Sequence, residues 1–304
     1  GRKPHAAKAI EILNAWAGRL KKVSGIDGVL ASGLQGFKFV NAAELIRYTD
    51  AGWTEAEARR CEASFKNAWL PTIEHYAYFA NGNWETAALQ TKMAIAVFCN
   101  DRELFEETVR YAVNGCGNGS IPHMIVYPTG QCQETTRAQH YVQLGIGLLT
   151  GAAEVAWQQG VDLYGWNDNL ILKGHEYTAK YGIGEDVPYR HYLDRTGKYG
   201  FGGRNNYYTK ISTASRGNFW PIFERPYQHY AKRRGVAAPY SGRVVEQKRP
   251  EGQSRDHIGL GTLTHYRPRI VATKPARAPG VPSGLVARTT EEGIRLTWVK
   301  SVDP

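Results

Sequence analysis

Four side chains that can hold an anion or move a proton lie within residues 134–141. Glu134, Arg137 and Tyr141 recur at the helical repeat and would share one face of a helix, with His140 adjacent. A guanidinium binds anionic groups, whereas a phenol and an imidazole can transfer protons. The spacing therefore predicts a helix whose polar beginning lines a site. A polar helix start followed by an ordinary core helix is the competing interpretation.

The continuation of this segment, to residue 151, is small and apolar. Gly145, Gly147 and Gly151 lower the helix propensity, but they allow neighbouring helices to approach closely. We therefore expect this half to pack in the core.

Helical patterns cover most of the chain before residue 200. Apolar residues recur with helical spacing in residues 6–22, 41–49, 54–70, 86–99, 101–114, 134–159 and 170–181. Thr54 and Glu57 have the spacing of a capping box, and Pro71 is expected to end the helix that they begin. The pattern predicts an all-α fold of antiparallel helix pairs, either a bundle, a solenoid or an (α/α) toroid that is an incomplete or complete barrel. No fixed repeat is present, which favours the toroid over the solenoid.

The composition points to an anionic partner. The 304 residues include 38 Lys and Arg against 28 Asp and Glu, a net charge of +10. A polyanionic sugar, a nucleic acid or a lipid headgroup would each fit this charge. We expect no membrane insertion, because no apolar run approaches the length of a membrane span. We expect no nucleic acid, because no recognisable reading module accompanies the basic residues.

The four cysteines lack the spacing of a metal or redox site, so no metal is expected. Cys116 and Cys132 bracket a Gly-rich loop and could form a disulfide, which would fit an oxidising compartment.

Several further segments occur in an informative order. They are GNWET (82–86), NDRELFEETVRY (100–111), GNGSIPHMIVYPTGQCQETTRAQHYVQLGIGLL (117–149), AEVAWQQGVDLYG (153–165) and HEYTAKYGIGEDVPY (175–189). Over about residues 6–235 this succession resembles the alginate lyase superfamily. Within it, the chain looks most similar to the alginate and glucuronan lyases of polysaccharide lyase family 38.

The resemblance implies an (α/α) toroid that cleaves an acidic polysaccharide by β-elimination at a uronic acid, with no cofactor. This elimination needs a donor that neutralises the C6 carboxylate, a base for the C5 proton and an acid for the departing O4. The implied catalytic residues are Asn83, Arg137, His140, Tyr141 and Tyr177. Relatives often carry histidine where this chain has Tyr141 and an acidic residue where it has Ala138. The base therefore stays open between Tyr141, His140 and Tyr177, with Tyr141 preferred because it shares the Glu134 face.

The resemblance also suggests residues that touch the substrate. These are Trp84, Gln131, Glu134, Tyr189, Arg190, Arg216, His229 and Tyr230. Core packing is the competing interpretation for each of them. Either Asn81 or Asn83 is expected to cap a helix. A loop at residues 197–210 is expected to cover the cleft or to be an ordinary surface loop.

Three domains are expected: a catalytic domain (1–235), a basic wrapping segment or linker (236–278) and a short β-type tail (279–304). In the tail, Leu285, Ala287, Ile294, Leu296 and Trp298 alternate as in strands, and the tail resembles the opening of a fibronectin type III module. A longer parent chain with further domains, secreted or periplasmic, is therefore expected.

Two other functions remain open. A glycoside hydrolase of the same fold would need paired carboxylates, for which Glu134, Asp168, Glu176 and Asp186 are available. A non-catalytic protein that binds acidic glycans would retain the polymer without forming a product.

Overall fold

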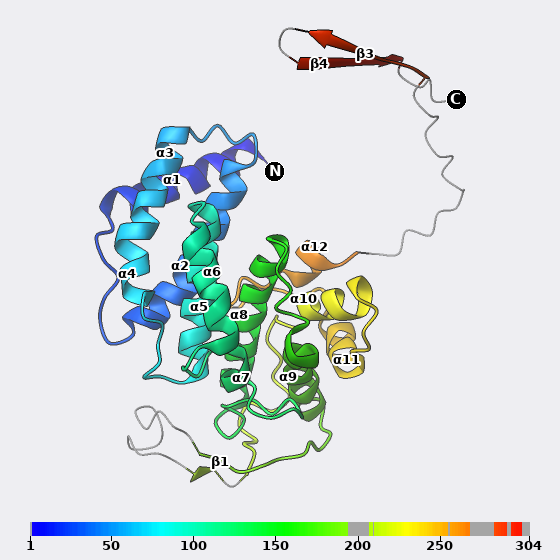
Figure 1. The fold of residues 1–304 in the computed structure, drawn as a ribbon. Coiled ribbons are helices and arrows are strands. Elements are labelled where there is room, and N and C mark those ends of the chain that lie inside the picture. Colours follow the sequence, from blue (N-terminus) through cyan, green and yellow to red (C-terminus); the bar gives the residue numbers. More distant parts are fainter. Residues whose placement is uncertain are drawn as a thin grey trace. The chain divides into compact units, whose positions relative to one another are not determined.

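A computed structural model describes residues 2–193, 207–208, 210–254, 256–267, 283–290 and 293–299. The chain divides into two units, Gly1–Tyr266 and Arg267–Pro304. The first unit is built from helices, which confirms the all-α prediction (Figure 1). Closure of the helices into a toroid stays a prediction. Most of the loop expected at residues 197–210 lies outside the described residues.

The elements of the first unit follow one another with short connections. They are α1 (Lys3–Arg19), α2 (Gly28–Arg47), α3 (Glu55–Ser64), the π-helix η1 (Phe65–Trp69), α4 (Leu70–Ile73), α5 (Gly82–Phe98), α6 (Arg102–Asn114), α7 (Ile121–Met124), α8 (Gln139–Gln158), α9 (Trp166–Gly182), β1 (Tyr192–Leu193), β2 (Tyr207–Tyr208), α10 (Glu224–Tyr227), the π-helix η3 (Gln228–Arg233), α11 (Pro239–Lys248) and α12 (Gly261–His265). Strands β1 and β2 pair antiparallel.

Helix α5 lies at the centre of this unit, packed between α2 and α8 (Figure 1). Nearly all of its residues are buried, so it has no solvent-facing side. The helix backbones touch at Gly33 of α2, where a Cβ would lie 2.5 Å from the carbonyl carbon of Ala87. On α8, the predicted close approach to a neighbouring helix is confirmed at Gly151, where a Cβ would overlap Gln90 Oε1 of α5. At Gly147 the close neighbour is instead His257, from a segment that is not helical, whose Cε1 would lie 2.7 Å from a Cβ.

Local signals predicted one helix boundary and missed others. Thr54 and Glu57 form the expected capping box, in which Glu57 Oε2 accepts from Thr54 N over 2.9 Å. The end expected at Pro71 is wrong, because this proline occupies the first turn of α4, where no backbone N–H is required. The start of α2 was missed because its Gly-rich first half, residues 28–40, hides the helical pattern.

Helix α8 begins at Gln139, so the helix start expected at residue 134 is wrong. Residues 134–138 form turns, and Ala138 takes the N-cap position with extended backbone (φ −77°, ψ 143°). Glu134 and Arg137 therefore do not lie on the same helix as Tyr141. A turn, rather than a continuous helix, brings Glu134 and Arg137 together, and the Arg137 guanidinium lies over the Tyr141 ring.

The first unit continues past residue 235, where a domain boundary was expected. Helix α11 packs on α9, and the carboxylate of Glu176 accepts the N–H groups of Tyr240 and Ser241 over 2.9 and 2.8 Å. Glu251 Oε1 then accepts Phe223 N over 2.9 Å. These bonds make the chain up to Tyr266 part of the helical unit.

The second unit contains β3 (Ser283–Thr290) and β4 (Gly293–Val299), which pair antiparallel with Ala287 opposite Leu296. The alternation in the sequence predicted these strands. The fibronectin type III module itself stays a prediction.

Two other expectations bear on the whole chain. All four cysteines are free thiols, and Cys116 is exposed whereas Cys132 is buried, so the disulfide that these two could have formed is absent. Among the described helices, none has the length and apolar character needed to span a bilayer.

A buried histidine should make the fold sensitive to acid. His175 on α9 is 0% exposed, and burial lowers its pKa to about 3, whereas an unfolded histidine titrates near pH ~6.5. Between these values the unfolded chain binds a proton that the folded chain does not, so the free energy of unfolding falls as the pH falls. We expect His175→Gln to reduce this pH dependence by up to about 1.4 kcal/mol per pH unit, measured by urea unfolding. The exposed His5→Gln serves as the control, and an equal slope in both variants would contradict the prediction.

Candidate functional site

A buried carboxylate joins the start of α5 to the turn that precedes α8. Glu134 is 1% exposed, and its Oε2 accepts from Asn83 Nδ2 over 2.6 Å and from Asn83 N over 3.2 Å. Its Oε1 accepts from the Arg137 guanidinium. Asn83 N belongs to the first turn of α5, where backbone N–H groups lack partners within the helix. Burial raises the pKa of Glu134, while Arg137 and Asn83 oppose that rise.

Arg137 links the buried Glu134 to side chains that are partly exposed at the protein surface. Its guanidinium carbon lies 3.9 Å from the centre of the Tyr141 ring, and the Tyr141 and His140 rings are 4.1 Å apart. Arg137, His140 and Tyr141 are half-buried, whereas Asn83 and Glu134 are buried. The Tyr141 hydroxyl has no hydrogen-bond partner within the described part of the chain. A guanidinium, an imidazole and a phenol thus share one surface, where they can bind an anion and move a proton.

His140 is held on its other side by residues that follow the described strand β2. Its ring stacks on Trp220 at 5.9 Å with an interplanar angle of 25°, and its Nδ1 lies 3.2 Å from Ser215 Oγ. Burial lowers the pKa of His140, the positive charge of Arg137 lowers it further, and Asp256 opposes both. We therefore expect a neutral imidazole at neutral pH.

Close packing of α5 on α8 keeps these parts together. A Cβ at Gly145 would clash with the Met124 side chain and would lie 3.6 Å from Asn83 Cα. The small residue predicted from the sequence therefore sits where the two helix starts meet. Asn81, rather than Asn83, takes the N-cap position of α5, although its side chain makes no capping bond.

The residues Gln131, Tyr177 and Arg190 form a different group. Gln131 exchanges two hydrogen bonds with the backbone of Arg190, of 2.8 and 2.9 Å. Tyr177 donates to Pro188 O over 2.9 Å, and burial raises its pKa. Tyr177 lines a separate pocket of about 350 Å³ between α9 and Tyr240. These residues hold the chain at 188–190, and the structure does not place Tyr177 beside Tyr141.

Tyr189 and Trp84 make local ring contacts. The Tyr189 ring lies 6.2 Å from that of His191, and the Trp84 ring lies 6.2 Å from that of Phe79. Trp84 adjoins Asn83 in the first turn of α5, whereas Tyr189 belongs to the segment held by Gln131.

The later candidates lie elsewhere in the helical unit. Arg216 donates to Tyr181 O over 2.8 Å at the end of α9. His229 stacks on Tyr164 at 3.8 Å, and burial lowers its pKa to about 4. Tyr230 donates to Tyr164 O over 2.8 Å.

His229 also packs on Trp157, with ring centres 4.7 Å apart. Trp157 lies sixteen residues after Tyr141 on α8, about 24 Å along a helix. His229 and Tyr230 are therefore at the opposite end of α8 from the cluster.

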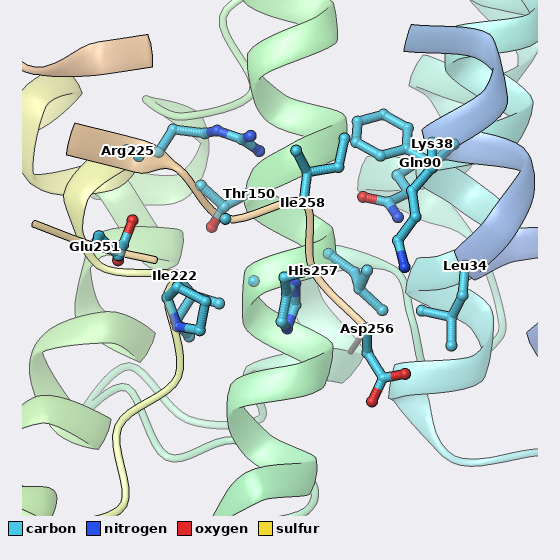
Figure 2. A pocket seen from close by; sticks show the side chains of 16 residues that line it. Leu34, Lys38, Gln90, Thr150, Ile222, Arg225, Glu251, Asp256, His257 and Ile258 are labelled. Atoms are coloured by element: carbon cyan, nitrogen blue, oxygen red, sulfur yellow. The ribbon is translucent and has the colours of Figure 1, made fainter. Parts of the chain in front are cut away.

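A small cavity lies deeper along α8 from the cluster. Figure 2 shows His257 and Ile258, from an extended segment, crossing α8 between Arg225 and Lys38. Its volume is about 30 Å³, enough for one or two waters and far below the ~300 Å³ or more of a typical small-ligand site. Trp220 separates it from the cluster, since its ring lies 5.7 Å from that of His257. A sugar ring does not fit in this cavity.

The sequence interpretation missed Ser215, Trp220 and Asp256. Trp220 lies in the segment RGNFWPIF, and its large aromatic ring was the feature of the sequence that could have indicated a site residue. Nothing local in the sequence connects Ser215 or Asp256 to His140. Within the described residues, no group of three or more His, Cys, Asp and Glu side chains could hold a metal ion.

Comparison with known proteins bears on the same region. A family model described as alginate lyase matches residues 1–187, which include the whole cluster from Asn83 to Tyr141. No curated protein and no solved structure matches the chain.

Removing the charge of Glu134 should destabilise the fold. Glu134→Gln would leave Arg137, whose side chain is 19% exposed, without its carboxylate partner. We expect the free energy of unfolding to fall by about 3 kcal/mol, measured by urea denaturation. The matched control is Glu11→Gln, because Glu11 pairs with Lys8 at the same sequence spacing but on the exposed surface. Glu11→Gln should leave the free energy of unfolding unchanged, because the pair is exposed. Equal losses of stability in the two variants would contradict a stabilising role for the buried Glu134.

Proposed function

Because the chain belongs to the alginate lyase family, we propose that it is a polysaccharide lyase that cleaves a uronate polymer by β-elimination. The observation that carries the proposal is the shared surface of Arg137, His140 and Tyr141, which rests on the buried Glu134 and Asn83. These three half-buried groups are of the kinds that this reaction needs.

The C6 carboxylate of the uronate would be bound by Arg137 and His140. Both groups can donate hydrogen bonds to a carboxylate, and the guanidinium carries a fixed positive charge. When the C5 proton leaves, negative charge develops on the carboxylate oxygens as an enolate forms. Donors already in place at that position lower the barrier, because they need no reorganisation during the reaction.

Tyr141 would move the proton. Its hydroxyl is unpaired within the described residues and stands beside the bound carboxylate, so the phenolate form can accept the C5 proton. The phenol can then return a proton to O4 as the glycosidic bond breaks. One residue on one side of the sugar ring would serve as base and as acid.

Asn83 has a different part in this proposal from the one expected from the sequence. It is 2% exposed and its amide donates to Glu134, so it holds the carboxylate that positions Arg137. The resemblance placed Asn83 against the substrate itself. In the proposal, Asn83 acts on the substrate through Glu134 and Arg137.

The finer identity of the substrate also belongs to the proposal. The net charge of +10 supports a polyanionic substrate. We assign the chain to polysaccharide lyase family 38, and its substrate to glucuronan or alginate, because its segments occur in the order that resembles this family. A secreted or periplasmic location and a longer parent chain rest on the resemblance of residues 279–304 to the opening of a fibronectin type III module.

The hydrolase alternative finds less support. Glu134 is buried against Arg137, Glu176 caps α11, and Asp168 pairs with Lys173 over 2.6 Å. Three of the four carboxylates that were available for a hydrolase are thus engaged elsewhere. Hydrolysis requires two carboxyl groups on opposite sides of the scissile bond. Glu134, Glu176 and Asp168 do not form such a pair, because each is bonded to a different part of the protein.

The direct test is Tyr141→Phe assayed on alginate, glucuronan, hyaluronan and pectate. β-Elimination creates an unsaturated uronate whose ultraviolet absorbance reports turnover. We expect the unmodified chain to cleave at least one polymer and Tyr141→Phe to lose about a hundredfold or more of that activity, because the general base is gone. Circular dichroism would check that the helices remain.

Tyr177→Phe discriminates between the two candidate tyrosines. If Tyr177→Phe loses activity and Tyr141→Phe keeps it, the general base is Tyr177 rather than Tyr141. Reducing ends released without ultraviolet absorbance would favour a hydrolase, and polymer binding without any product would favour a glycan-binding protein.

A further inference from the structure

A non-helical segment, residues 212–220, which contains a turn at residues 214–217, is bonded along the first turns of α8. Gln139 is 4% exposed, and its N donates to Ala214 O over 2.8 Å. Gln143 is 2% exposed, and its Oε1 accepts from Trp220 N over 2.7 Å. Two buried glutamines thus fix the segment at both ends on the helix that carries His140.

Within this segment, Trp220 stacks on the His140 ring and Ser215 forms the hydrogen bond to it. The backbone of Ser215 is strained. Its φ is +62°, in the left-handed region that glycine and asparagine adopt more readily than serine. Such a conformation persists where the surroundings determine it. Here the next residue, Arg216, donates to Tyr181 O over 2.8 Å and to Glu185 O over 3.1 Å at the end of α9.

The Ser215 hydroxyl is directed at one nitrogen of His140. Ser215 Oγ lies 3.2 Å from Nδ1, and neither side chain has another hydrogen-bond partner in the described ranges. Nε2 is left for a ligand. An imidazole nitrogen is a stronger acceptor than a hydroxyl oxygen, so the favoured arrangement has the Ser215 O–H donating to Nδ1.

Burial and the positive charge of Arg137 favour the neutral ring of His140, whereas the negative charge of Asp256 opposes them. Arg137 faces it from the turn before α8, Asp256 from the extended segment near the cavity, and Tyr141 from α8 itself. Burial and Arg137 outweigh Asp256 in their effect on the pKa. A neutral imidazole has a single N–H, so the partner of Nδ1 decides whether Nε2 donates or accepts a hydrogen bond.

We propose that Ser215 is a positioning residue that places the proton of neutral His140 on Nε2. His140 then donates a hydrogen bond to the substrate carboxylate and leaves the base role to Tyr141. The consequence for catalysis rests on the proposed function, whereas the tautomer of His140 does not.

The tautomer can be measured by NMR without any substrate. In protein labelled with ¹⁵N-histidine, long-range ¹H–¹⁵N spectra distinguish a protonated ring nitrogen from an unprotonated one. The His140 signals are identified by their loss in His140→Gln. We expect the unmodified protein, at a pH where the ring is neutral, to show a protonated Nε2 and an unprotonated Nδ1.

Two variants separate the hydroxyl from the backbone strain. Ser215→Ala and Ser215→Gly both remove the hydroxyl, but only glycine relieves the left-handed conformation. We expect both to shift His140 towards a mixture of tautomers. Thr213→Ala, in the same turn but exposed and without a side-chain hydrogen bond in the described residues, should leave the spectrum unchanged.

A protonated Nδ1 in the unmodified protein would overturn the inference, and so would the same tautomer in both Ser215 variants as in the unmodified protein. On a polymer that the chain cleaves, Ser215→Ala and Ser215→Gly should both lose about fivefold in kcat/KM, the value of one hydrogen bond. Absence of cleavage by the unmodified protein would count against the proposed function alone, because the NMR spectrum decides the tautomer by itself.

Discussion

The buried carboxylate of Glu134 is the interaction on which the candidate site depends. Taking a carboxylate out of water is costly, and it is tolerated only where donors replace the lost water. Asn83 supplies two donors from the start of α5, and Arg137 supplies a charged one from the turn before α8. Because these groups come from segments far apart in the sequence, the carboxylate fixes where two helices begin. It also fixes the guanidinium over the Tyr141 ring.

Close helix packing makes this arrangement possible. Gly33 lets α2 touch α5, and Gly145 lets the start of α8 lie against Asn83 and Met124. A Cβ at Gly33 would overlap the backbone of Ala87 and push α2 away from α5, whereas a Cβ at Gly145 would displace the Met124 side chain. The polar cluster and the small residues therefore form one structural unit, in which packing sets the distances and the carboxylate sets the orientation.

The segments after residue 210 complete the surroundings of His140, although they lie outside the family match at residues 1–187. Trp220 stacks on one face of its ring, and Ser215 approaches Nδ1. Beyond Trp220, the chain around His257 packs across α8 and leaves only a cavity of about 30 Å³. In the proposed function, the part of the chain matched by the family model supplies the reacting groups, and the later chain sets their environment.

The sequence by itself determined the helical class, the capping box at Thr54, the strands of the tail and the small residues of α8, because each depends on local spacing. It also brought forward Asn83, Glu134, Arg137, His140 and Tyr141, which the structure places in contact through side-chain bonds and rings. Only the tertiary structure decided that α8 starts at Gln139, that Asn83 is buried, and that His229 and Tyr230 lie at the far end of α8. The reason is physical: burial and hydrogen-bond partners are set by residues distant in the chain, and a periodic pattern carries no information about them.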